Sequence, residues 1–364
     1  MHGSASTKQS FLTVSQFALI IFGCIVGVGV LSLPNGVVKI AHQDGWISTL
    51  IGGIYPLYVV IIASYIAKKF PNDNILVLSK KYFGGILGSI FNLIFATYFI
   101  YTTSMIASYY SNLMRSYMVG FLTSFKLLAI VFICTIYVVS RGLEVIGRIS
   151  EILFYITIVL LLSPTMTLQI SNMTNINPVF GSGLIPIVEG GIKSTFSYSG
   201  AEIIFLIYPF LKEKKKMLSS SLIIVTIIVA IYVWCVFITI FYLGPDIVNR
   251  SFWSFLTVTE SISIIIINNY RYVFATFWSL IAFKSISINA YASIFIIKDL
   301  AYKIDKKNFY LLLYPLFLYL ALKFGNEISR GNINEKLSPS YIVFNLLYMT
   351  VIAIFVFFKG GGKA

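Results

Sequence analysis

The chain has 364 residues, of which 58% are hydrophobic and only 11% are charged. Soluble domains carry about a quarter charged residues, so this chain has too few to cover a globule that faces water on all sides. The formal charge of +14 does not indicate a nucleic-acid partner, because the basic residues form short clusters rather than a continuous stripe. Apolar blocks of the roughly 20 residues that cross a ~30 Å hydrocarbon core instead predict an integral protein of the lipid bilayer.

Ten transmembrane helices are predicted, within a single membrane domain of residues 1–364. In chain order they cover residues 17–38, 46–67, 86–112, 118–140, 149–170, 187–211, 218–243, 272–297, 309–324 and 341–358. Residues 169–191, rich in Asn, Gly and Pro, are expected to form an exposed external loop. The apolar run 252–267, interrupted by Glu260, is either a lid on the external face or an interfacial packing helix.

The distribution of lysine and arginine predicts the orientation. Basic residues are more numerous in the connections on the side of the N-terminus, for example at 68–69, 80–81 and 212–216. By the positive-inside rule, both termini of this multi-pass protein are expected in the cytoplasm. The start lacks a basic region and a cleavage site, so the first span is expected to be retained. With two histidines, and with three cysteines inside apolar blocks, no metal site or disulfide framework is expected.

The first span contains residues that disfavour a continuous helix. Two glycines and a proline lie within its apolar run, at positions 27, 29 and 34. Inside a helix glycine costs about 1 kcal/mol and proline about 3 kcal/mol, and backbone groups freed in lipid need other partners. One interpretation is a break that lines a cavity, and the other is a glycine-mediated helix contact with a kink at Pro34. The candidate ligand-binding residues here are Gly27, Val28, Gly29, Val30 and Leu31.

The sixth span carries a matching interruption. Its residues 196–202 read Phe-Ser-Tyr-Ser-Gly-Ala-Glu, so a glycine, polar side chains and a carboxylate lie within an apolar run. The two interrupted spans are five spans apart, which divides the domain into a first five-helix repeat, 17–170, and a second, 187–358, of opposite orientation. Paired interrupted helices in inverted repeats predict a ligand site near the bilayer midplane.

Two crossing broken helices suit a zwitterionic ligand such as an amino acid. N–H groups at the start of a half-helix favour a carboxylate, and free carbonyls at the end of a half-helix favour an ammonium group. Phe196 and Tyr198 are predicted to close over the ligand, while the small Ser199 and Gly200 leave room for its side chain. Two further candidate contacts, both in the third span, are Tyr98 and Tyr101.

These residues resemble the amino acid–polyamine–organocation transporter superfamily. Its members carry a Gly-x-Gly-hydrophobic segment in the first helix, here residues 27–30, and an aromatic-x-aromatic-x-Gly-x-Glu pattern in the sixth, here residues 196–202. The resemblance implies an all-α, LeuT-like fold, a 5+5 inverted repeat with broken helices one and six. It also implies that the ligand carboxylate meets backbone N–H groups of residues 27–31 and that its amine meets carbonyls of both broken helices.

Within this superfamily the chain most resembles the spore germination B-subunit (GerAB-like) family. The length, the number of spans, the Gly-Val-Gly-Val-Leu-Ser-Leu-Pro segment at 27–34 and the Tyr-Pro-Phe-Leu segment at 208–211 are similar. This resemblance implies a germinant sensor in the spore inner membrane, beside a germinant-receptor A subunit and a lipoprotein C subunit.

Two ionisable residues lie deep in the spans, where such residues are costly and by default mark function. Lys284 is in the eighth span, which in the LeuT-like fold faces the break of the first span at a sodium site. One hypothesis is that its ammonium replaces that sodium by bonding carbonyls near Gly27 and couples binding to protons. The alternative is a lysine that snorkels or pairs structurally. Glu202 is either a protonatable gate residue or a cap for backbone groups of the sixth span.

The predicted function is that of a germinant-receptor B subunit, which binds a small amino-acid-like germinant and signals spore germination. The alternative is a proton-coupled or exchanging amino-acid transporter that uses the same site. No enzyme and no cofactor are expected, since the sequence has no recognisable nucleophile–base pair, metal cluster or nucleotide motif. The sequence contains no filter-like loop of the kind that ion channels use, so a channel is not indicated. The sequence shows no deep charged residue besides Glu202 and Lys284, and a neutral amino acid is therefore the favoured ligand.

Overall fold

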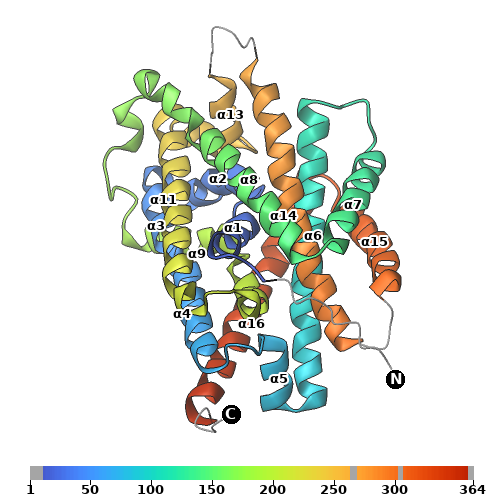
Figure 1. Cartoon of the computed structure of the whole chain (residues 1–364). Coiled ribbons are helices and arrows are strands. Elements are labelled where there is room, and N and C mark those ends of the chain that lie inside the picture. The colour runs from blue at the N-terminus through green and yellow to red at the C-terminus, as the bar shows by residue number, and fades with distance from the viewer. Residues whose placement is uncertain (1–10, 263–268, 302–305, 360–364) are drawn as a thin grey trace, which may run out of the picture.

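The computed structural model describes residues 11–262, 269–301 and 306–359. This part of the chain is mostly helical, and the long helices run roughly side by side in one bundle (Figure 1). Six stretches are long and apolar enough to cross a membrane within the described residues: Gly29–Lys69, Gly85–Tyr117, Leu143–Ile170, Lys214–Leu243, Tyr270–Leu300 and Glu327–Phe358. The shorter apolar helices are Val14–Ile25, Ser124–Ser140, Ala201–Phe210 and Leu312–Lys323. The chain is therefore a multi-pass membrane protein.

The helices follow the predicted order of ten spans, and three of these spans are split. The split spans are the first, α1 (Val14–Ile25) and α2 (Gly29–Ala41), the second, α3 (Gly45–Gly52) and α4 (Ile54–Lys69), and the sixth, α9 (Leu184–Ser194) and α10 (Ile204–Ile207). The other spans are α6 (Gly85–Tyr117), α7 (Ser124–Ser140), α8 (Leu143–Leu162), α11 (Met217–Leu243), α14 (Tyr270–Leu300), α15 (Lys306–Lys323) and α16 (Glu327–Lys359). The connections contain α5 (Ile75–Phe83), α12 (Pro245–Arg250) and α13 (Ser254–Glu260).

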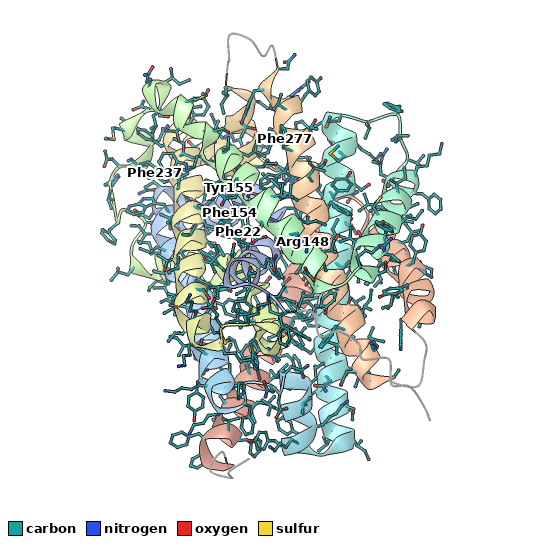
Figure 2. All side chains as sticks on the ribbon, in the orientation of Figure 1. Phe22, Arg148, Phe154, Tyr155, Phe237 and Phe277 are labelled. Carbon is teal, nitrogen blue, oxygen red and sulfur yellow. The ribbon has the colours of Figure 1, made fainter. Side chains whose placement is uncertain are left out.

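The half-helix α1 lies at the centre of the bundle, against α8, α11 and α14 (Figure 1). The ring of Phe22, on α1, packs edge-on against Phe154 of α8, with the ring centroids 4.9 Å apart (Figure 2). A helix surrounded by protein in this way is shielded from lipid, which allows it to end in the middle of the bundle without exposing free backbone groups to hydrocarbon.

The start of the first span is joined to the end of the sixth. Thr13 caps α1, since its hydroxyl accepts a hydrogen bond from Gln16 N at 3.1 Å while Gln16 Oε1 accepts one from Thr13 N at 3.2 Å. Immediately before this cap, Leu12 N donates to Phe210 O at 2.8 Å. Lys212 N in turn donates to Leu12 O at 3.1 Å. The ends of the two broken spans are thus linked through the backbone.

Several span boundaries differ from the sequence prediction. The sequence places the start of the tenth span at residue 341, but α16 already begins at Glu327. The fourth span begins at Ser124 rather than 118, because the Thr123 hydroxyl accepts a hydrogen bond from Lys126 N and caps the helix there. The fifth span is α-helical only to Leu162 and continues as a 3₁₀-helix.

Two connections are more ordered than a simple loop. Within the predicted loop 169–191, the Asp44 carboxylate accepts hydrogen bonds from Phe180 N at 2.8 Å and from Ser182 N at 2.9 Å, and α9 has already begun. In the run 252–267, of which residues 263–267 lie outside the described residues, Ser254 N donates to Asn35 Oδ1 of α2 at 3.1 Å. The side chains of α13 are largely buried, which favours the packing helix over a free lid.

The division into repeats at 17–170 and 187–358 stays a prediction. The cytoplasmic placement of both termini also stays a prediction, and residues 1–10 and 360–364 lie outside the described residues.

Candidate functional site

The first span is interrupted between α1 and α2, and two neighbouring helices bond the carbonyls that lose their helical donors. Ser285 of α14 places its hydroxyl 2.7 Å from Gly23 O and 3.2 Å from Val26 O. Tyr232 of α11 donates its hydroxyl to Ile25 O at 3.0 Å. Because a free backbone carbonyl inside a membrane protein costs several kcal/mol, these two side chains account for the stability of the break.

The sixth span is interrupted at Ser199 and Gly200. Ser199 is extended, and Gly200 has φ +117°, a conformation that side chains with a Cβ rarely adopt. Gly200 also lies against α1: a Cβ at this position would be 2.8 Å from the carbonyl oxygen of Cys24. The glycine therefore permits both the turn in the sixth span and the direct backbone contact between the two broken spans.

Glu202 follows this break and is completely buried. Its Oε2 accepts hydrogen bonds from Gly200 N at 2.6 Å and from the Tyr98 hydroxyl at 3.1 Å. Its Oε1 accepts hydrogen bonds from the Tyr55 hydroxyl and, at 3.4 Å, from Asn345 Nδ2. The carboxylate thus caps the second half of the sixth span and ties it to α4, α6 and α16. These bonds favour the capping role over that of a gate.

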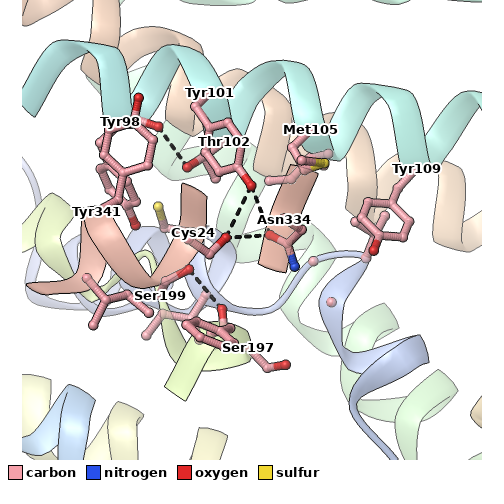
Figure 3. Close-up of a pocket in the computed structure, with 18 of the residues that line it drawn as sticks. Cys24, Tyr98, Tyr101, Thr102, Met105, Tyr109, Ser197, Ser199, Asn334 and Tyr341 are labelled. Atoms are coloured by element: carbon pink, nitrogen blue, oxygen red, sulfur yellow. Dashed lines mark hydrogen bonds between the residues drawn. The ribbon is translucent and has the colours of Figure 1, made fainter. Parts of the chain in front are cut away.

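A cavity of about 130 Å³ lies between the two breaks and the facing sides of α6 and α16 (Figure 3). Backbone and side chains of both broken spans form one wall, and a row of α6 residues one helical turn apart forms the other. The lining residues are Cys24, Ile25, Gly27, Val28, Gly29, Ser32, Tyr98, Tyr101, Thr102, Met105, Ile106, Tyr109, Phe196, Ser197, Ser199, Asn334, Ser338, Tyr341 and Ile342. None of these side chains carries a formal charge.

Seven predicted ligand-binding residues line the cavity: Gly27, Val28, Gly29, Tyr98, Tyr101, Phe196 and Ser199. Four others do not. Val30 and Leu31 are buried in α2, and Gly200 faces α1. Tyr198 turns away from the cavity, packs on Tyr232 with the ring centroids 5.0 Å apart and donates its hydroxyl to Thr49 O at 2.9 Å. The prediction that Tyr198 closes over the ligand is therefore wrong in this structure, since the break directs its ring towards α3.

Polar residues of α16 complete the cavity. The Tyr101 hydroxyl donates to Asn334 Oδ1 at 2.9 Å and lies 3.1 Å from Ser338 Oγ (Figure 3). Asn334 and Ser338 are four residues apart, a spacing that places both on one face of a helix. The sequence prediction misses them because it assigns residues 325–340 to a connection, although this polar spacing is a signal that identifies them.

Lys284 lies behind the break of the first span rather than in the cavity. It is buried on α14, with Nζ 5.3 Å from the ring centroid of Phe22. Within the described part of the chain, Nζ has no hydrogen-bond partner, so the predicted bonds to carbonyls near Gly27 are not formed. The hydroxyl of the next residue, Ser285, bonds the carbonyls of Gly23 and Val26 instead. Successive residues of a helix are rotated by about 100°, so Ser285 faces the break while Lys284 does not.

A buried arginine lies beside the end of the cavity. The guanidinium of Arg330, on α16, stacks on Tyr109 of α6, with its carbon 3.8 Å from the ring centroid. Its Nη1 is 3.3 Å from Ser108 Oγ, and its Nη2 is 3.5 Å from a carboxylate oxygen of Glu327. Since Tyr109 also lines the cavity, Arg330 lies directly behind a cavity-lining side chain.

The backbone N–H groups in the first turn of α2 are available to bind a ligand. No side chain caps this helix at Val28 in the described residues, although helix N-termini carry unsatisfied N–H groups and a positive dipole end. Val28, Gly29 and Ser32 all line the cavity. An anionic group in the cavity thus meets this half-helix at its N-terminus.

The family follows from a comparison of the whole sequence. A family model described as "Spore germination protein" matches residues 11–327. The chain belongs to this family. Three relatives are spore germination proteins as well. YndE of Bacillus subtilis (strain 168) is 25% identical over 79% of this chain and 80% of its own length. GerQB of Bacillus cereus is 22% identical over 90% of each chain, and protein KB of B. subtilis is 23% identical over 96% and 94%.

Solved structures show the fold of this spore germination protein. MhsT in complex with L-phenylalanine has a TM-score of 0.70 and 14% identity, covering 96% of this chain and 90% of that chain. Mhp1, a nucleobase-cation-symport-1 family transporter, has a TM-score of 0.63 and 12% identity over 88% and 74%. A Na⁺-coupled sialic acid symporter has a TM-score of 0.60 and 15% identity over 96% and 78%. This chain therefore has the LeuT-like fold, as predicted.

Proposed function

We propose that this protein is the B subunit of a germinant receptor and that it binds a small, neutral amino acid in the cavity between the two broken spans. The observation that carries the proposal is the cavity itself, which is lined by the backbone of both breaks and by uncharged side chains. A volume of about 130 Å³ suits a small ligand. Occupancy of the cavity is the signal that starts germination.

The donor and acceptor groups of the cavity match a zwitterion. The ligand carboxylate meets the N–H groups at the start of α2, near Gly29, where the dipole of the half-helix favours negative charge. The ammonium group meets carbonyls at the ends of the preceding half-helices, near Ile25 and Ser197. Tyr101 and Asn334 lie opposite and contact the ligand side chain.

The setting of the receptor follows from the family. We infer that the chain lies in the spore inner membrane with both termini in the cytoplasm, and that it acts with a germinant-receptor A subunit and a lipoprotein C subunit. Spore germination proteins such as GerQB and KB, which align along nearly the whole chain, support this assignment.

An amino-acid transporter is the second candidate, because the fold is that of transporters such as MhsT, whose structure holds L-phenylalanine. Receptor and transporter share the binding chemistry and differ in the conformational cycle that follows binding. In either case, Lys284 is the residue proposed to couple binding to protons, since its buried ammonium lies next to the α1 half-helix.

Reconstitution of the purified chain in liposomes tests the proposal. Binding and uptake of radiolabelled neutral amino acids are measured with and without a proton gradient. We expect saturable binding without uptake. We also expect Gly29→Leu to abolish binding, because the added side chain enters the cavity. Gly36→Leu is the matched control, since a Cβ at Gly36 meets nothing within 4 Å. Saturable uptake would favour the transporter, and failure of every neutral amino acid to bind would overturn the ligand class.

A further inference from the structure

A second, larger hollow lies at the end of the bundle where α4 ends and α11 begins. It has a volume of about 740 Å³ and shares no lining residue with the ligand cavity. Its lining residues are Ile61, Ser64, Tyr65, Ala67, Lys68, Pro71, Tyr208, Lys214, Lys215, Met217, Leu218 and Leu222. We refer to this hollow as the α4–α11 groove.

One part of the α4–α11 groove is an apolar wall that faces outwards. Ile61 of α4 is 56% exposed and Leu218 of α11 is 45% exposed, and both helices belong to stretches that are apolar and long enough to cross a membrane. Leu222, one turn beyond Leu218, extends the wall along the same helix. In a bilayer this wall is in contact with acyl chains.

The other part of the groove is a basic rim. Lys214 donates a hydrogen bond to Asn72 Oδ1 at 2.6 Å, which fixes its ammonium group at the rim. Lys68 and Lys215 are exposed and make no ion pair with an acidic residue in the described part of the chain. Glu213, the acidic residue next to this cluster, is paired with Lys216 at 2.8 Å. Since the partner of Lys214 is a neutral amide oxygen, the rim offers three positive charges, from Lys68, Lys214 and Lys215, that no acidic residue of the described part of the chain pairs.

A polar group inside the groove also lacks a partner. The Ser64 hydroxyl is buried and makes no hydrogen bond within the described residues. A hydroxyl in a transmembrane helix ordinarily bonds the carbonyl one turn earlier or a polar neighbour. The Ser64 hydroxyl is therefore available to a polar group of a molecule that enters the groove.

We propose that the α4–α11 groove is a binding site for an anionic phospholipid of the leaflet at this end of the protein. The phosphate pairs with Lys68 and Lys215, an ester oxygen accepts a hydrogen bond from the Ser64 hydroxyl, and an acyl chain lies along Ile61 and Leu218. Basic pockets between transmembrane helices bind acidic headgroups in this manner. A zwitterionic phospholipid fits less well, because its amine repels the same lysines.

The site also touches the sixth span. Tyr208, at the end of the second half of that span, lines the groove and donates its hydroxyl to Asp73 O. The bound lipid thus contacts a segment that is continuous with the break at Gly200. A lipid in the groove therefore lies against the end of the sixth span without entering the ligand cavity.

The test uses the purified full chain and short-chain lipids. Native mass spectrometry and thermal melting are recorded with phosphatidylglycerol, with phosphatidylcholine, and with glycerol phosphate, which has the anionic group but no acyl chains. We expect phosphatidylglycerol to bind at least about fivefold more tightly than phosphatidylcholine, since each basic residue near the surface contributes on that order. Equal binding of the two lipids would overturn the proposal, and so would binding of glycerol phosphate as tight as that of the lipid.

Paired variants separate a built site from general surface charge. The double variant Lys68→Gln/Lys215→Gln is expected to lower the affinity for phosphatidylglycerol at least about fivefold. Its control, Lys69→Gln/Lys212→Gln, removes the same charge from two exposed lysines at the same end that do not line the groove. We expect the control to bind like the wild type. An equal loss in both variants would identify diffuse electrostatic attraction and overturn the site.

Ser64→Leu, which fills the groove, is a further variant expected to lower lipid binding while leaving amino-acid binding intact.

Discussion

A Cβ atom on Gly200 would lie 2.8 Å from the carbonyl oxygen of Cys24, so the two broken spans of this protein touch backbone to backbone. The same glycine has φ +117°. Two separate requirements, close approach and a left-handed conformation, thus coincide at one residue. The ligand cavity begins beside this contact, since Cys24 and Ser199 both line it.

Gly200→Ala is expected to destabilise the protein. The strained backbone alone costs about 1–3 kcal/mol, and the opposing atoms belong to backbone, which cannot rotate away. We expect a lower apparent Tm in detergent. Gly36→Ala is the control, because a Cβ at Gly36 meets open space and alanine favours the α2 helix more than glycine does. The Tm of this variant is expected to be unchanged or slightly higher. A Tm for Gly200→Ala equal to that of the wild type would show that the two backbones are not in contact.

Glu202→Gln is expected to destabilise the protein by about 1–3 kcal/mol. Each carboxylate oxygen accepts an N–H, from Gly200 on one side and from Asn345 on the other. An amide therefore places its NH₂ group against one of these donors. Chemical denaturation or thermal melting measures the loss. Glu189→Gln, an exposed acid on the first half of the same span, is expected to melt like the wild type. Equal stability of the two variants would mean that Glu202 does not cap the sixth span.

Arg330→Lys is expected to lower the stability by at least about 1 kcal/mol, although it keeps the positive charge. The planar guanidinium stacks on Tyr109 in a fully buried position, and an ammonium group cannot reproduce this contact. The control is Arg141→Lys, because Arg141 also lies over a tyrosine, Tyr137, at 4.8 Å, but is exposed. We expect a change within about 0.5 kcal/mol for the control. Equal effects of the two substitutions would contradict a special role for the buried stack.

Lys284→Met is expected to leave the protein as stable as the wild type or to stabilise it. The ammonium is buried without a hydrogen-bond partner in the described residues, and an apolar side chain of similar length removes the cost of that burial. Ligand binding by the variant is expected to lose its dependence on pH. Lys323→Met, at the exposed end of α15, is the control for both measurements. Ligand binding with an unchanged pH profile in Lys284→Met would exclude a coupling role for this lysine.

The sequence by itself determined the membrane class, the ten spans and both interruptions. The length of an apolar run predicts a span, and glycine or polar residues within the run predict an interruption, because both act on the backbone locally. In lipid a free N–H or carbonyl is costly, so an interruption within a span is a recognisable feature of the sequence. Gly27, Gly29 and Ser199, which the sequence singles out, line the cavity between the two breaks, and their contact with a ligand stays a prediction. The family resemblance rests on the same segments.

Only the tertiary structure decided which side chains meet at the breaks. Asn334 and Arg330 lie in a polar stretch typical of a connection, yet α16 continues through it because these side chains face α6 and the cavity instead of lipid. Tyr198 and Lys284 belong to the right segments but point elsewhere, towards Thr49 and Phe22. The direction of a side chain depends on how helices distant in sequence approach one another, and the local pattern of residues carries no information about that approach.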